Sequence, residues 1–217
     1  MRTLKSDSRA AQSGKATSLV VVLHGYGADG ADLLGLADSL APHLPDTAFA
    51  APDAPEPCRG GYGRQWFPIP WLDGSSEVAA AIGLAAATDD LNGYLDQQLA
   101  AHSLSADRLC VLGFSQGAMM AMHVVPRRHA AIAGIVAISG RLLVPERIGE
   151  VVSKPPVLLI HGDEDQVVPF TDMGTAGRTL VAAGFETFGH VMHGTGHGIA
   201  PDGLQVALSF IAERLGN

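Results

Sequence analysis

Hydrophobic and polar residues along this chain fall into two alternating patterns. Short runs made only of apolar residues, such as 19–23 and 157–160, are typical of strands buried on both faces of a sheet. Between these runs apolar residues recur every three or four positions, as over 76–102, which is typical of helices packed on one side. Strands that alternate with helices predict an α/β fold, with a mostly parallel central sheet and helices on both faces.

The same two patterns locate the other elements. Strands are expected over 19–23, 47–51, 108–112, 132–138, 157–160 and 186–192, and helices over 32–44, 76–102, 116–125, 171–183 and 201–215. The stretch 52–76 is rich in Pro and Gly and should be irregular, whereas 1–17 should be a polar N-terminal segment. We find no internal repeat and no linker long enough to separate domains, so residues 1–217 are expected to form a single domain.

Composition narrows the class of protein. Hydrophobic residues make up 47% and charged residues 17% of the 217 residues, which allows a sizeable core and excludes global disorder. The 14 Lys and Arg against 22 Asp and Glu give a net charge of −8, which argues against nucleic acid and anionic membrane surfaces as partners. The chain shows no signal-like start, no apolar run long enough for a membrane span and only two cysteines, Cys58 and Cys110. A cytoplasmic protein is therefore expected.

A candidate nucleophile lies between an expected strand and an expected helix. Gly113-Phe114-Ser115-Gln116-Gly117 fits G-x-S-x-G, in which a sharp turn lifts the serine oxygen above the edge of the sheet. Glycines on both sides remove side chains that would collide with the neighbouring strand and helix. The turn also aims the N–H of Gln116 at the position of a developing oxyanion.

A serine nucleophile needs a base that is oriented by an acid, in loops that follow later strands. The loop HGDEDQVVP (161–169) offers the acid, and Asp165 is preferred over Asp163 because it lies further from the strand end and can curl back toward the sheet. The base is expected in the glycine-rich loop before the last helix. His197 is the candidate there, with His193 as its local rival.

Two other motifs point to different chemistry. His193 and His197 have the i,i+4 spacing of a zinc-binding helix, but the glycines between them disfavour a helix, so no metal is expected. Gly25, Gly27 and Gly30 match G-x-G-x-x-G after a strand, with Asp53 near the place of a ribose-binding acid. A capping signal after Gly30 and the turn around Asp53 argue against a dinucleotide site, and no cofactor is expected. The loop would instead supply a second oxyanion N–H, from Tyr26.

The ordered set HGYGADG (24–30), GFSQG (113–117), HGDEDQVVP (161–169) and GHGIAPDGL (196–204) resembles the phospholipase/carboxylesterase family of α/β-hydrolases. The resemblance covers about 18–215 and implies an α/β-hydrolase fold. It also implies Ser115 as nucleophile, His197 as base and Asp165 as the orienting acid, with an oxyanion hole from the N–H groups of Tyr26 and Gln116. Family members often carry Leu in place of Tyr26 and Pro in place of Gln166, and the first departure affects the shape of the pocket more than catalysis.

Substrate contacts are expected from two segments. Arg64-Gln65-Trp66-Phe67-Pro68-Ile69-Pro70-Trp71 lies in the irregular stretch, and the resemblance places it over the acyl side, with Trp66 and Phe67 as contacts. Leu143, after the strand 132–138, is a further candidate, whereas Met119 is expected in the core. An exposed apolar patch at 66–71 would alternatively support a homodimer.

The resulting hypothesis is a serine carboxylesterase that hydrolyses carboxylic esters through an acyl-enzyme intermediate. No large cap is inserted between the strands 132–138 and 157–160, so an open site and a small-molecule ester or acyl substrate are expected. The alternatives are acyl-protein thioesterase or lysophospholipase activity on the same triad. An inactive hydrolase fold used only for binding is disfavoured because all three triad residue types are present.

Overall fold

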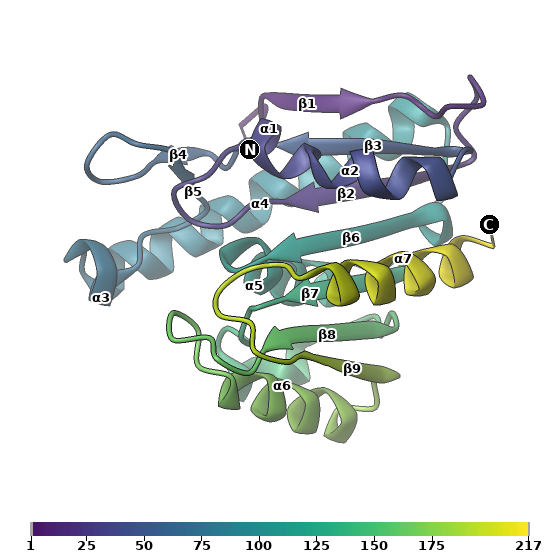
Figure 1. Ribbon diagram of the computed structural model, residues 1–217. Coiled ribbons are helices and arrows are strands. Elements are labelled where there is room, and N and C mark those ends of the chain that lie inside the picture. The colour runs from purple at the N-terminus through teal and green to yellow at the C-terminus, as the bar shows by residue number, and fades with distance from the viewer. Residues whose placement is uncertain (1, 217) are drawn as a thin grey trace.

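The computed structural model describes residues 2–216 and is built on one seven-stranded sheet (Figure 1). Its spatial order is β1-β3-β2-β6-β7-β8-β9, and every neighbouring pair is parallel except β1 with β3. The strands are β1 (Ser6–Arg9), β2 (Ser18–Leu23), β3 (Thr47–Pro52), β6 (Leu109–Phe114), β7 (Gly134–Ile138), β8 (Val157–Gly162) and β9 (Thr187–Met192). The mostly parallel sheet expected from the sequence is confirmed.

Helices cover both faces of this sheet. In Figure 1, α2 and α7 lie in front of the strands, and α4, α5 and α6 lie behind them. The helices are α1 (Gly30–Leu34), α2 (Leu36–Leu40), α3 (Pro70–Asp73), α4 (Glu77–His102), α5 (Gln116–Val124), α6 (Thr171–Ala182) and α7 (Pro201–Leu215). Alternate strand side chains therefore enter two separate apolar layers, one beneath α4, α5 and α6 and one beneath α2 and α7.

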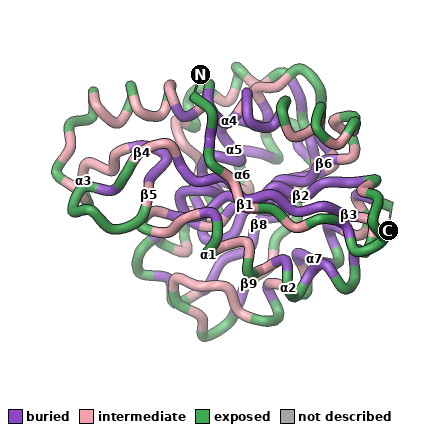
Figure 2. Tube along the Cα trace, turned by 90° about the horizontal axis from the view of Figure 1, so that it is seen from above, coloured by how far each residue is buried: buried purple, intermediate pink, exposed green. Residues whose placement is uncertain are grey.

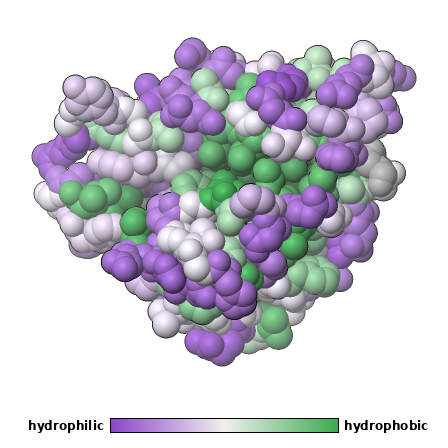
Figure 3. All heavy atoms as spheres, in the orientation of Figure 1, coloured by the Kyte–Doolittle hydropathy of each residue, from purple (hydrophilic) through white to green (hydrophobic). Residues whose placement is uncertain are grey.

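Burial follows the same layers. The strands β2, β3, β6, β7 and β8 run through the buried centre of the molecule, and exposed residues lie mainly on the outer helices and loops (Figure 2). Apolar side chains gather over the middle of the front face, between α2 and α7, with hydrophilic residues around them (Figure 3). Cys58 and Cys110 are both buried and form no disulfide. No helix within residues 2–216 is both long and apolar enough to cross a membrane.

Three segments differ from the expectation. β1 lies within the stretch expected to be only a polar segment, and it pairs antiparallel with β3 at the edge of the sheet. Its residues, SDSR, are all polar, so no apolar alternation marks the strand. The single helix expected over 32–44 is divided at Gly35 into α1 and α2, followed by a short 3₁₀ turn. The stretch 52–76 holds the two-residue strands β4 (Glu56–Pro57) and β5 (Arg64–Gln65) as well as α3.

Candidate active site

Ser115 occupies a strained turn between β6 and α5. Its φ of 54° and ψ of −118° place it outside the regions that residues with a side chain usually adopt. The flanking glycines make this turn fit, because a Cβ on Gly113 would lie 2.4 Å from the backbone of Gly117. A Cβ on Gly117 would lie 2.0 Å from the carbonyl oxygen of Leu23. The turn thus requires the glycines of G-x-S-x-G and presents the serine at the carboxyl end of β6.

Three side chains that are far apart in sequence meet at this turn. His197 Nε2 lies 3.0 Å from Ser115 Oγ, and His197 Nδ1 lies 2.7 Å from Asp165 Oδ2. Asp165 comes from the loop after β8, and His197 from the loop between β9 and α7. Both contacts have hydrogen-bond geometry, so the imidazole connects the hydroxyl to the carboxylate. The structure therefore brings together the three residues that the sequence selected.

The carboxylate of Asp165 is buried, and both of its oxygens accept hydrogen bonds. The backbone N–H groups of Val167 and Val168 donate to its Oδ1, each at 2.9 Å. Burial would raise the pKa of Asp165, but its hydrogen bonds with His197, Val168 and Val167 hold the pKa below the usual value. His161 Nε2 also lies 3.3 Å from Oδ2. An ionised Asp165 can therefore fix the orientation of the His197 ring and stabilise its positive charge.

The rival histidine and the rival carboxylate pair with each other instead. His193 Nδ1 lies 2.8 Å from Asp163 Oδ2, and this contact lowers the pKa of Asp163. The side chain of His193 is 84% exposed, against 18% for His197. Ser115 forms its side-chain hydrogen bond with His197 and not with His193. The two acid–histidine pairs thus share the same two loops, and only one of them reaches the serine.

Two backbone N–H groups beside Ser115 remain free for a ligand. Within residues 2–216, neither Tyr26 nor Gln116 donates its backbone N–H to a protein acceptor. Gln116 is the first residue of α5, where a helix leaves its N–H groups without an intrahelical partner. Close approach of the Tyr26 loop depends on Gly25, because a Cβ there would lie 3.1 Å from the Cβ of Ser115.

The side chain of Gln116 has a role that the sequence did not indicate. Its Oε1 accepts the backbone N–H of Trp66 at 2.9 Å, and its Nε2 donates to the carbonyl of Phe67 at 2.7 Å. Trp66 is completely buried and donates its indole N–H to the carbonyl of His24. This amide anchors the loop over the start of α5. The sequence feature that could have indicated this role is the polar side chain of Gln116, directly after the serine of G-x-S-x-G.

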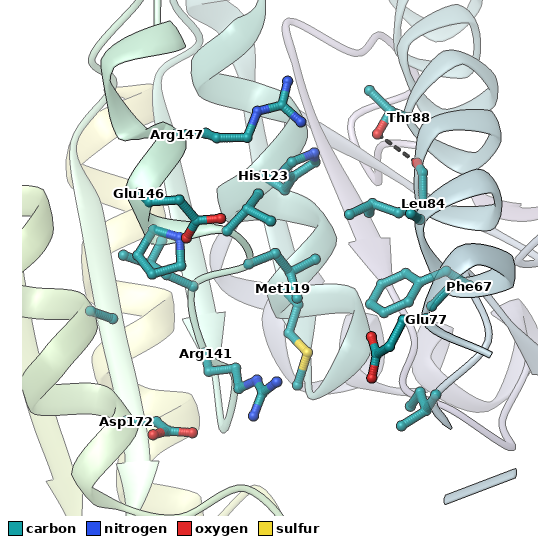
Figure 4. Close-up of a pocket in the computed structure, with 18 of the residues that line it drawn as sticks. Phe67, Glu77, Leu84, Thr88, Met119, His123, Arg141, Glu146, Arg147 and Asp172 are labelled. Atoms are coloured by element: carbon teal, nitrogen blue, oxygen red, sulfur yellow. Dashed lines mark hydrogen bonds between the residues drawn. The ribbon is translucent and has the colours of Figure 1, made fainter. Parts of the chain in front are cut away.

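A groove of about 880 Å³ begins one helical turn beyond Ser115, at Met119 (Figure 4). Phe67 and Leu143, the expected substrate contacts, line it, and Met119, which belongs to the hydrophobic core as expected, lines it as well. Trp66 does not line the groove, because its buried ring packs inside the loop. Only Trp71 of the two tryptophans is exposed, so the apolar patch expected at 66–71 is interrupted by a core residue.

The glycine-rich segment at 25–30 serves α1 rather than a nucleotide. Asp29 caps the helix, with its side chain accepting the N–H of Asp32, so the helix begins at Gly30 and not after it. Asp53 Oδ1 accepts the N–H of Gly30 at 3.0 Å, and a Cβ on Gly30 would lie 2.3 Å from the carbonyl oxygen of Ala51. Asp53 Oδ1 therefore accepts a hydrogen bond from the protein's own backbone, where a nucleotide site would need this oxygen for a ribose hydroxyl. Among residues 2–216, no group of three or more His, Cys, Asp or Glu side chains is arranged to hold a metal.

Comparison with known proteins agrees with this geometry. The solved structure of esterase PE8 superimposes with a TM-score of 0.93 at 42% identity, covering 99% of this chain and 100% of that one. Acyl-protein thioesterase 1 of Neurospora crassa is 29% identical over 92% of this chain and 87% of its own length. A probable carboxylesterase of Oryza sativa subsp. japonica is 30% identical over 95% of this chain and 81% of its own length.

The fold is therefore that of an α/β-hydrolase, as the resemblance implied, and it carries no large cap. The sequence model of the family described as phospholipase/carboxylesterase matches residues 8–215, which is almost the whole chain. This match places the protein among hydrolases, in agreement with a serine at the tip of a strained strand–helix turn. The chain belongs to the phospholipase/carboxylesterase family.

Proposed function

We propose that this protein is a serine carboxylesterase in which Ser115 is the nucleophile, His197 the base and Asp165 the orienting acid. The observation that carries the proposal is the continuous hydrogen-bonded path from Ser115 Oγ through His197 to Asp165 Oδ2. The relatives that are named esterase, carboxylesterase and thioesterase support the same class of reaction. The substrate is a small-molecule ester or an acyl group carried on a larger partner.

The reaction starts when His197 Nε2 takes the proton of Ser115 as its oxygen attacks the ester carbonyl. The N–H groups of Tyr26 and Gln116 then donate to the carbonyl oxygen as it becomes negative, which lowers the barrier by about 3–4 kcal/mol per donor. His197 passes its proton to the leaving alcohol, and the acyl group remains on Ser115. Water activated by the same imidazole then releases the acid and restores the serine.

Thioesters and lysophospholipids are the alternative substrates for this site. Both place a carbonyl carbon before Ser115 and a leaving group beside His197, so the same residues would act on them. Acyl-protein thioesterase 1 among the relatives favours the thioester reading as the second candidate. Comparing kcat/KM for an oxygen ester and a thioester of the same acyl chain ranks the two substrates.

The replacement Ser115→Ala tests the proposal on any ester that the protein hydrolyses. Loss of the nucleophile should lower kcat by about four orders of magnitude or more, because the rest of the triad then has nothing to activate. A folded variant, shown by an unchanged circular dichroism spectrum, excludes a general loss of structure. Hydrolysis that stays within tenfold of the wild-type rate would refute the assignment of Ser115.

A further inference from the structure

The groove beside Ser115 changes character along its length. Its floor is α5, from which Met119 and His123 project one and two turns beyond Ser115, and its walls are α4 and the segment 141–150. Around Met119 the lining includes the apolar side chains of Phe67, Leu84 and Leu143. Glu77 and Arg141 also lie at this end (Figure 4). Around His123 it becomes polar, with Thr88, Arg127, Arg147 and Glu150.

The two arginines at this polar end are already paired, whereas Glu146 beside them forms no ion pair within residues 2–216 (Figure 4). Arg147 Nε lies 2.7 Å from Glu150 Oε1, and Arg127 Nε lies 3.6 Å from Glu150 Oε2. Arg127 also donates to the carbonyl oxygens of His123 and Arg147, at 2.7 Å and 3.2 Å. An anionic substrate group would therefore have to displace Glu150 from these arginines before it could bind here.

His123, by contrast, has no hydrogen bond from its ring. The residue is only 8% exposed, and its Nδ1 is shielded from solvent without a partner. Within residues 2–216, Nε2 has no protein partner either, and because it is not among the atoms shielded from solvent, it is the ring nitrogen that a ligand in the groove can contact. A buried polar group without a partner destabilises a folded protein, which calls for an explanation in a native structure.

The ring is neutral at physiological pH. Burial, together with Arg127 and Arg147, lowers the pKa of His123 to about 4. A neutral imidazole offers one donor and one acceptor, which suits an uncharged hydroxyl or carbonyl group better than a carboxylate.

The distance along α5 between Ser115 and His123 sets how far such a group lies from the reacting carbonyl. The eight residues from Ser115 to His123 correspond to about 12 Å along the axis of α5. With carbon–carbon bonds of about 1.5 Å in a zigzag, an extended chain of eight to ten carbons covers this distance. The intervening side chains, Met119 and Leu84, are apolar and suit the methylene groups of that chain.

The groove takes the acyl part of the substrate and not the alcohol. The leaving alcohol must lie next to His197 Nε2, which gives it a proton. His197 does not line the groove, whereas Val168, which donates to Asp165 from the other side, does. The acyl chain therefore has the space along α5.

Resting on the serine esterase function proposed above, we propose that the preferred substrates are esters of medium-chain acids with a hydroxyl or carbonyl group near the far end of the acyl chain, and that His123 binds this group. His123 then determines specificity without touching the reacting atoms. A plain alkyl chain of the same length leaves the imidazole unpaired and places its methyl end among polar side chains.

The test compares nitrophenyl esters of two straight acids of roughly ten carbons, one ending in hydroxyl and the other in methyl. In the wild type, kcat/KM for the hydroxylated ester should exceed that for the alkyl ester by about tenfold. In His123→Phe, which keeps a ring of similar size without hydrogen-bonding atoms, the ratio should fall to about one. A hydroxylated acid of half the length cannot reach His123 and should show no preference over its alkyl counterpart.

The controls separate this proposal from the proposed function. Met119→Leu alters the apolar part of the groove, so it should change kcat/KM for both long esters together and leave their ratio intact. The acetate ester, which does not enter the groove, should be hydrolysed by the wild type and not by Ser115→Ala. A ratio near one in the wild type, or a ratio unchanged in His123→Phe, would overturn the role of His123. Acetate hydrolysis that survives Ser115→Ala would instead overturn the esterase mechanism.

Discussion

Two carboxylates two residues apart, Asp163 and Asp165, are each paired with a histidine, and their surroundings differ sharply. The side chain of Asp165 is completely enclosed, whereas that of Asp163 is 30% exposed. Only the enclosed pair continues to a serine. The sequence could narrow the candidates to these loops because each follows a strand, but the pairing depends on how two loops fold over each other. The residues near each carboxylate in the sequence therefore do not predict which histidine it contacts.

Replacing the two histidines separately should give opposite results. His197→Ala removes the base that is hydrogen-bonded to Ser115 and should lower kcat by roughly three to six orders of magnitude. His193→Ala breaks an exposed pair with Asp163 and should leave kcat within about threefold of the wild type. Steady-state kinetics on one ester, with both variants purified in parallel, measures the difference. A large loss in His193→Ala together with an active His197→Ala would exchange their roles.

At the scale of elements, α5 links the candidate catalytic residue to the groove. Its first residue, Gln116, is beside the serine and fixes the loop at Trp66, and its later turns place Met119 and His123 along the floor of the groove. The strand before it and the bounds of α5 were predictable from the apolar runs and from Pro126. Which face of so apolar a helix lines a cavity was not predictable, because all nine of its residues are buried.

His123 should make the stability of the fold depend on pH. Its pKa is about 4 in the folded protein and about 6.5 in an unfolded chain, so the unfolded state binds more protons between these values. The free energy of unfolding should therefore fall as the pH decreases from 7 toward 4, by up to about 3 kcal/mol from this residue. Urea unfolding across this range, compared with His123→Phe, measures the contribution. Equal pH dependence of the wild type and the variant would contradict it.

Across the whole molecule, one sheet holds the candidate site together. Ser115, Asp165 and His197 follow β6, β8 and β9, whose carboxyl ends lie at the same edge. The order of strands and helices predicted this edge, because loops after parallel strands gather there. The sequence could not predict β1, whose polar residues lack a hydrophobic pattern and whose place depends on the open edge of β3.

Because every major element packs on this sheet, we propose that the chain unfolds as one cooperative unit. Thermal unfolding should give a single transition in which the calorimetric and van't Hoff enthalpies agree. The tryptophan signal, which reports on the 66–71 segment, should change at the same temperature as the far-ultraviolet circular dichroism. A tryptophan transition well below the main one would show that this segment is a separate unit.

The most direct test of the central claim is to locate the covalent bond that the mechanism requires. A fluorophosphonate, which reacts with activated serines, should modify the wild-type protein at one site, and peptide mass mapping should place the label on Ser115. Ser115→Ala should not be labelled, and His197→Ala should be labelled far more slowly because its hydroxyl is no longer activated. A label on another residue, or equal labelling of the wild type and Ser115→Ala, would contradict the account.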